Sequence, residues 1–392
     1  MDLSNFRFND TANMSHFQLF DSNINFSSIC KKNVVTETWS YNRLDIYDRC
    51  IFIVDVIVVS FFCLFGFLGN GLSIVVLRRD HDKQNATNWL LQALAVLDTL
   101  YLVTCIFIQP LKTICRLTNW LPDLKDAFPY LEGYFWSAAS ITQTATIWML
   151  VLVTSDRFAA VCRPLKTDLR SLRRARVAVG VVVIAAVLYN LPLFFEREVV
   201  LRRCGDVIYW DPVKTAMRID YLYYLVYKTI LFFVFRTVGP LTILMVLNLR
   251  LISALRVVRQ RRKTLQKRRG TAKNRENITL MLVVVVSAFI VCEIPDLALR
   301  VTVTLMEQFS EDEKVIQLVN SLTNMLLTLN SSFNFVIYCL VGKKFRGILR
   351  QMFPCASLSK QHPSQAASET EPLTNVYRLN AVNLNTIVTT NV

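Results

Sequence analysis

The chain has 392 residues, of which 53% are hydrophobic, and a formal net charge of +15. Its apolar residues lie in long blocks instead of recurring at the spacing of a half-buried helix or strand, which excludes an ordinary soluble domain. Seven blocks have roughly the 20 residues that a helix needs to cross a bilayer. Because strands cross lipid only in closed barrels, the sequence predicts an all-α membrane protein, a seven-transmembrane helix bundle.

In chain order, a polar tail over residues 1–49 comes first, with glycosylation sequons at Asn9, Asn13 and Asn25. The bundle follows over residues 50–341. A short amphipathic eighth helix is predicted at 342–355, and a disordered cytoplasmic tail at 356–392. The seven membrane helices are predicted at 51–77, 89–111, 134–155, 177–195, 222–249, 279–305 and 316–341.

Lysine and arginine gather in alternate loops. The loop between the fifth and sixth helices, RVVRQRRKTLQKRRGTAKNRE, is the most basic, and the loops on the other side hold far fewer cations. Since basic loops stay in the cytoplasm, the pattern predicts a plasma-membrane protein with its N-terminus outside. Basic runs between membrane segments favour contact with membrane lipids and an acidic cytoplasmic partner over nucleic acid.

Asp156 and Arg157 stand where the third apolar block ends. Charges at that depth are costly unless they are paired or hydrated. An aspartate that holds the arginine until the helices move would make the pair a switch. The alternative is a pair of charges that only anchor the helix end at the membrane surface.

The stretch TSDRFAAVCRPL around this pair resembles the Asp-Arg-Tyr signature of rhodopsin-like (class A) G-protein-coupled receptors, with Phe158 in place of the tyrosine. The segments YNLPLFFE (189–196), LNLRLISAL (247–255) and NSSFNFVIYCLVGKKFR (330–346) are similar to the invertebrate FMRFamide-type neuropeptide receptors. Further landmarks of the superfamily follow in the right order: Asn70 in GFLGNGL, Asp98 in LAVLD, Pro240, FIVCEIPDL in the sixth helix, NFVIY in the seventh and GKKFRGIL after it.

The resemblance implies a receptor for an extracellular neuropeptide, a short amidated FMRFamide-like peptide, that signals through heterotrimeric G proteins. Arrestin and receptor kinases are the implied cytoplasmic partners, and Tyr338 joins Asp156 and Arg157 in the implied G-protein switch. Two alternatives stay open: a receptor for another small molecule or a lipid, and a membrane transporter. An enzyme is not expected, because the sequence shows no catalytic constellation and its three histidines lie in tails or loops.

Polar residues inside the helices predict two further sites. The first is a polar core of Asp98, Asn70, Asn330 and Asn334, which holds either a sodium ion or an ordinary interhelical hydrogen-bond network. The second is a charged pocket, open to the outside, for a peptide with an arginine and an aromatic amide; a packing pair of Arg236 and Asp296 is its structural alternative. The predicted ligand-binding residues are Glu132, Trp136, Gln143, Trp210, Arg236, Glu293, Asp296 and Arg300.

Within the pocket, Glu293 replaces the tryptophan that the family has in its sixth helix, so it is predicted to read the charge of the ligand. The family's cysteine at the outer end of the third helix is missing, with Glu132 in its place. Cys115 is therefore the predicted partner of Cys204 in a disulfide, and Cys30 is the alternative. Cys355 is a predicted palmitoylation site, and the chain end at Val392 a possible PDZ ligand.

Overall fold

The computed structural model describes residues 44–79, 86–118, 120–162, 172–204, 207–264, 271–305 and 313–352. Within these residues, seven helical spans are long and apolar enough to cross a membrane, which confirms the predicted seven-helix fold. Most spans extend beyond the predicted ends, because their terminal turns are too polar to stand out as apolar sequence. The spans are Ile46–Arg79, Ala86–Leu117, Ala127–Cys162, Leu172–Phe195, Tyr221–Val257, Thr279–Leu299 and Lys314–Val341.

Several spans are built from more than one kind of helical turn. The first three consist of α2 (Ile46–Phe52), η2 (Ile53–Val58) and α3 (Val59–Arg79); α4 (Ala86–Ile106), η3 (Phe107–Leu111) and α5 (Lys112–Leu117); and α6 (Pro122–Cys162). The remaining helices are α7 (Leu172–Asn190), η5 (Leu191–Phe195), α8 (Ala216–Ile219), α9 (Tyr221–Tyr223), η6 (Tyr224–Thr237), α10 (Val238–Thr264), α11 (Thr271–Leu305), α12 (Glu313–Val341) and α13 (Lys343–Met352).

The helices pack around α4 and α6. The α4 helix lies against α3 and α6, α12 lies against α3 and α11, and α10 packs on α6. Leu94, Met149, Leu244 and Val286 are fully buried between them. Large apolar side chains on the outer faces of α3 and α7 stay exposed, which suits helices that face lipid.

Wide π-helical turns, η2, η3 and η6, interrupt three of the spans. Proline removes a backbone donor from the α-helical ladder; Pro110 lies inside η3, and Pro240 follows η6. At Gly239 a Cβ atom would lie 2.0 Å from the carbonyl oxygen of Val234, so this wide turn leaves no room for a side chain. The π turns of η6 set the direction of the polar residues Lys228 and Arg236.

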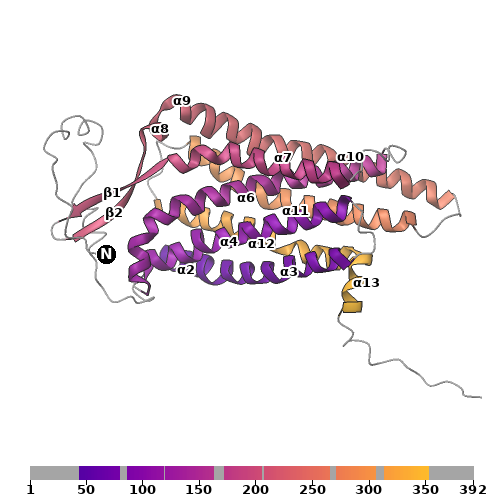
Figure 1. The fold of residues 1–392 in the computed structure, drawn as a ribbon, viewed down its shortest axis with the longest axis horizontal. Helices are drawn as coiled ribbons and strands as arrows, with labels where there is room; N and C mark the ends of the chain where they lie inside the picture. Colours follow the sequence, from indigo (N-terminus) through magenta and orange to yellow (C-terminus); the bar gives the residue numbers. More distant parts are fainter. Residues whose placement is uncertain are drawn as a thin grey trace, which may run out of the picture. The chain divides into compact units, whose positions relative to one another are not determined.

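Residues 196–221, between the fourth and fifth spans, contain a β-hairpin. Strands β1 (Arg197–Cys204) and β2 (Val207–Lys214) pair antiparallel, with Leu201 opposite Trp210. The hairpin packs on α6 and lies at the left in Figure 1. We call this end of the bundle the hairpin end.

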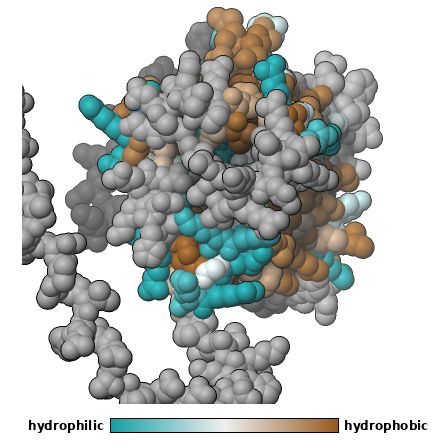
Figure 2. All heavy atoms as spheres, turned by 90° about the vertical axis from the view of Figure 1, so that its right-hand side faces the viewer, coloured by the Kyte–Doolittle hydropathy of each residue, from teal (hydrophilic) through white to brown (hydrophobic). Residues whose placement is uncertain are grey.

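The predicted eighth helix is present as α13. Phe345 anchors it, because its ring contacts the rings of Phe335 and Tyr338 on α12 at centroid distances of 5.9 and 5.7 Å. Figure 2 looks at the end of the molecule that lies to the right in Figure 1. Hydrophobic residues lie on the upper and right-hand flanks of that view, and hydrophilic residues gather below its centre, as expected of a bundle with sides in lipid and an end in water.

Candidate ligand cavity and switch

A cavity of about 400 Å³ lies at the hairpin end, within the size range of small-molecule and cofactor sites. Side chains from α6, α7, η5, β1, η6, α11 and α12 line it, so residues far apart in the sequence meet there. Three predicted ligand residues, Trp136, Arg236 and Asp296, lie in this lining. The cavity combines aromatic surface with charged groups, a lining suited to a peptide.

Arg236 is held at the floor of the cavity. Its guanidinium donates a hydrogen bond to Oε1 of Gln143, and its Cζ atom lies 5.2 Å from the centroid of the Phe232 ring. Both predicted residues, Gln143 on α6 and Arg236 on η6, are thus brought together. Asp296 lines the same cavity from α11 and is only 4% exposed.

Glu293 lies elsewhere. It borders a second cavity of about 10 Å³, with Gln143, Phe289 and Asn330 among its neighbours. That volume holds no more than one water molecule. The structure therefore makes Asp296 the acidic group of α11 on the large cavity, and places Glu293 beside the water-sized one.

The other predicted ligand residues lie nearer the hairpin. Glu132 forms ion pairs with Lys112 at 2.6 Å and Arg197 at 3.5 Å. Trp210 on β2 is 38% exposed, and its ring contacts Tyr130 at 4.9 Å between centroids. Neither residue is part of the lining of the large cavity. They brace the hairpin against α6.

A buried carboxylate, Glu196, was not predicted as a site residue. It is 4% exposed and lines the large cavity directly after η5. The Lys228 ammonium lies 2.8 Å from its Oε1 atom, the Tyr223 hydroxyl donates to the same oxygen at 2.7 Å, and Arg218 donates to Oε2. The sequence could have indicated this cluster, because Glu196 and Lys228 stand at or within the ends of apolar segments, where an unpaired charge is costly.

Of the residues predicted for the polar core, Asp98 on α4 and Asn334 on α12 are in direct contact. Asn334 Nδ2 donates to Asp98 Oδ2 at 2.7 Å, and Asn70 Nδ2 donates to the Ser331 carbonyl at 3.1 Å. Two buried oxygens, Asp98 Oδ1 and Asn70 Oδ1, have no hydrogen-bond partner among the described residues. A carboxylate and an amide oxygen left in this state fit a small cation, for which oxygen ligands are typical.

At the opposite end of α6, Asp156 and Arg157 form the predicted ion pair. Arg157 Nη2 lies 2.5 Å from Asp156 Oδ2, and the two side chains are 2% and 12% exposed. Thr87 on α4 donates its hydroxyl to the same carboxylate oxygen at 2.8 Å. The α4 helix therefore holds the aspartate while the aspartate holds the arginine.

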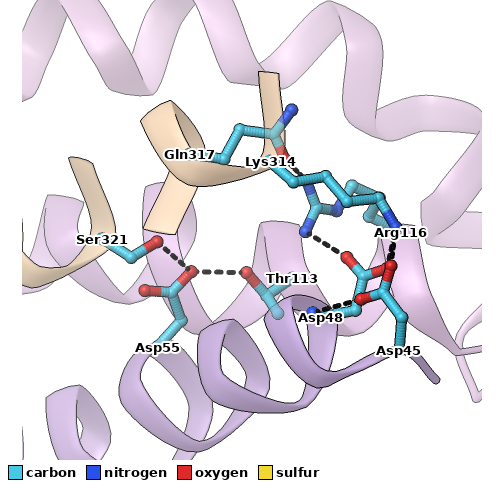
Figure 3. A network of polar contacts seen from close by, with 8 residues as sticks. All are labelled: Asp45, Asp48, Asp55, Thr113, Arg116, Lys314, Gln317 and Ser321. Atoms are coloured by element: carbon cyan, nitrogen blue, oxygen red, sulfur yellow. Dashed lines mark hydrogen bonds and ion pairs between the residues drawn. The ribbon is translucent and has the colours of Figure 1, made fainter. Parts of the chain in front are cut away.

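A second network, also not predicted, links three spans at the hairpin end (Figure 3). Asp55 on η2 is 5% exposed, and its Oδ2 atom accepts hydrogen bonds from Thr113 on α5 at 2.7 Å and Ser321 on α12 at 3.3 Å. An acid within the first apolar block was a signal that sequence reasoning passed over.

The network continues toward the surface through charged groups. Lys314 on α12 contacts Asp45 and Asp48, the latter at 3.2 Å, and Arg116 on α5 donates to Gln317 at 2.6 Å. Asp45 caps α2 by accepting from the Asp48 N–H. This hydrogen bond, and then the Lys314 contact, hold the pKa of Asp45 below its ordinary value.

The predicted disulfide between Cys115 and Cys204 is not seen on the side of Cys115, and the side chain of Cys204 is not described. Cys115 is a free thiol, 4% exposed within the packing of α5. The hairpin that carries Cys204 packs on α6 instead. The resemblance gave the loop position of the cysteine but not the direction in which Cys115 points.

Several predicted residues lie outside the described part of the chain. These are the sequons at Asn9, Asn13 and Asn25, the palmitoylation site Cys355 and the terminal Val392. The side chains of Arg300 and Cys204 are likewise not described, although their backbones belong to α11 and β1.

A seven-helix bundle with a cavity at one end and an acid–arginine pair at the other defines a membrane receptor. The family model for the 7 transmembrane receptor (rhodopsin family) matches residues 69–338 of the sequence, so the chain belongs to that family. It is similar to the FMRFamide receptor of Drosophila melanogaster, with 28% identity over 347 residues, 88% of this chain and 60% of that receptor.

Two further relatives point the same way. The chain is 29% identical over 319 residues to the FMRFamide peptide receptor frpr-18 of Caenorhabditis elegans, a match that covers 78% of this chain and 71% of that receptor. It is 28% identical over 326 residues to the sex peptide receptor of Drosophila melanogaster, covering 78% and 74% respectively. Membership of a receptor family counts against the transporter alternative.

Proposed function

We propose that this protein is a plasma-membrane receptor for a short amidated FMRFamide-like neuropeptide and that it signals through heterotrimeric G proteins. The observation that carries the proposal is the 400 Å³ cavity, lined by charged and aromatic side chains at the hairpin end. The basic loops of the sequence support an orientation in which this end and the N-terminus lie outside. Two of the relatives are named as FMRFamide receptors.

In this proposal, Asp296 receives the arginine of the peptide. The carboxylate is 4% exposed and borders the cavity, so an ion pair there forms largely out of water. Trp136 and Tyr189 give aromatic surface in the same lining for the aromatic amide. Arg236, held by Gln143 and Phe232, shapes the floor.

The signal reaches the other end as a shift between two packings of the same helices. The resting packing is the one described, with Arg157 held by Asp156 and Tyr338 buried against Phe345. In the signalling packing, Arg157 leaves Asp156 and inserts among the helices that receive the G protein. The polar core at Asp98 lies between the two sites, and a sodium ion there would be held by Asp98 and Asn70 oxygens.

The cytoplasmic and lipid contacts complete the proposal. Arrestin and receptor kinases would share the face used by the G protein. Palmitoylation of Cys355, glycosylation of Asn9, Asn13 and Asn25, and a PDZ partner at Val392 are proposed from the sequence.

The direct test is a screen of synthetic amidated peptides on transfected cells, with calcium and cyclic-AMP readouts. A response to peptides ending in Arg-Phe-amide, absent from untransfected cells, supports the proposal. Arg157→Ala should abolish that response and leave peptide binding unchanged at equal surface expression. A receptor that answers none of the peptides, or an Arg157→Ala variant that signals normally, would contradict it.

A further inference from the structure

The basic side chains around the large cavity outnumber the carboxylates that they contact. Glu196 is shared by Arg218 and Lys228, both of which line the cavity. Nearby, Glu132 is shared by Arg197, which also lines the cavity, and Lys112. In both clusters one carboxylate serves two cations.

Glu196 accepts three contacts through its two oxygens. Its Oε1 atom receives the Lys228 ammonium and the Tyr223 hydroxyl, both within 2.8 Å, and its Oε2 atom receives Arg218. A lysine ammonium carries three donors. Glu196 accepts one from Lys228, and the side chain of Lys228 is 22% exposed on the cavity.

An excess positive charge in this place is costly without an anion. The Glu196 side chain is 5% exposed, and those of Lys228 and Arg218 are 22% and 25% exposed, so the three charges are partly withdrawn from water, where like charges repel more strongly. A ligand that brings a negative group would lower that cost and gain charge-assisted hydrogen bonds. Electrostatic complementarity of this kind sets which ligands are accepted.

We propose that the ligand carries a side-chain carboxylate, in addition to its arginine, and that Lys228 and Arg218 bind it in the lining of the cavity. The inference rests on the proposed peptide-receptor function and narrows its ligand class. The accepted peptides have an acidic residue on the N-terminal side of the amidated Arg-Phe end. Lys228 is the specificity-determining residue, because it comes from η6 into the lining and its ion pair among the described residues is with Glu196.

The test uses pairs of synthetic peptides that share the Phe-Met-Arg-Phe-amide end and differ by Glu or Gln at one preceding position, taken in turn. At one position, the Glu peptide should be about ten-fold more potent on the unmodified receptor, the ratio expected for one charge-assisted contact. In Lys228→Gln this ratio should fall to about one, while Lys228→Arg should keep it. Surface expression and the potency of a peptide with neither residue serve as folding controls.

Arg218→Gln is the second variant, in case Lys228→Gln does not reach the surface, and it should reduce the same ratio. Equal potencies of the Glu and Gln peptides at every position overturn the inference and leave the proposed function standing. A preference for Glu that is unchanged in both variants also overturns it. If no peptide of either kind elicits a response, the proposed function itself fails.

Discussion

Replacing Asp156 by asparagine should raise signalling in the absence of peptide. The aspartate is 12% exposed, and its Oδ2 atom lies 2.5 Å from Arg157 Nη2 and 2.8 Å from Thr87 Oγ1. A hydrogen bond to a charged group contributes about 1.5–3 kcal/mol, and a neutral one about 0.5–1.5 kcal/mol. The resting packing should therefore lose about 1.5 kcal/mol, which moves the ratio of signalling to resting receptor roughly ten-fold.

Thr87→Val tests how much the hydrogen bond from α4 to Asp156 contributes to the resting packing, apart from the ion pair between Asp156 and Arg157. This change removes one donor to Asp156 and leaves the ion pair in place, whereas Asp156→Asn weakens the contacts of both donors, so the shift should be smaller than that of Asp156→Asn. Thr99→Val is the matched control, because Thr99 lies on the same helix and donates only to the Ala95 carbonyl one turn earlier.

The assay measures basal calcium and cyclic-AMP signals of the three variants at equal surface expression. The expected order is Asp156→Asn above Thr87→Val, with Thr99→Val at the level of the unmodified receptor. If Asp156→Asn and Thr87→Val both match the Thr99→Val control, the pair does not restrain Arg157 and the reasoning is wrong.

Asp296→Asn should lower agonist potency about ten-fold for a peptide with arginine and less for its citrulline analogue. Glu293→Gln, beside the water-sized cavity, should lower the potency of both peptides equally. An equal loss of potency for both peptides in Asp296→Asn would refute the recognition of the ligand's charge by Asp296. The pKa of Asp45 is lowered, first by the Asp48 N–H and then by Lys314, so its ionised form stabilises the receptor fully above the ordinary value of 3.8, and this contribution is lost as the pH falls from 3.8 through the lower pKa of the folded state. Asp45→Asn should therefore lower the temperature of thermal unfolding at neutral pH, and the difference from the unmodified receptor should shrink on acidification. Gly239→Ala should reduce the yield of folded receptor, because its Cβ would lie 2.0 Å from a carbonyl oxygen, while Gly180→Ala, with open space around it, should not.

The sequence predicted the seven helices because each membrane span requires a continuous block of mostly apolar residues. It also predicted the Asp156–Arg157 pair, whose partners are neighbours. Contacts between distant segments were harder. Glu196 and Lys228 are 32 positions apart and meet only because the hairpin and η6 fold over the same cavity.

Two other differences have local causes. Apolar and polar residues do not alternate regularly in the segment 197–214, so its sequence did not predict the two paired strands. The disulfide predicted for Cys115 depended on its position in the chain, which does not give the burial of its side chain, and Cys115 is a free thiol that is 4% exposed. The number and order of the helices can therefore be predicted from the apolar blocks of the sequence. The polar contacts between helices cannot, because they depend on how each helix is rotated about its axis.

The network around Asp55 has a mechanical consequence for the bundle (Figure 3). Its hydrogen bonds and ion pairs join the first span, α5 and α12 at the hairpin end, and no residue of η6 or α11 takes part in those contacts among the described residues. The three joined segments act as a fixed frame. Of the elements that line the cavity, α12 belongs to this frame, whereas η6 and α11 do not, so a peptide that enters the cavity contacts both the joined and the unjoined part of the bundle.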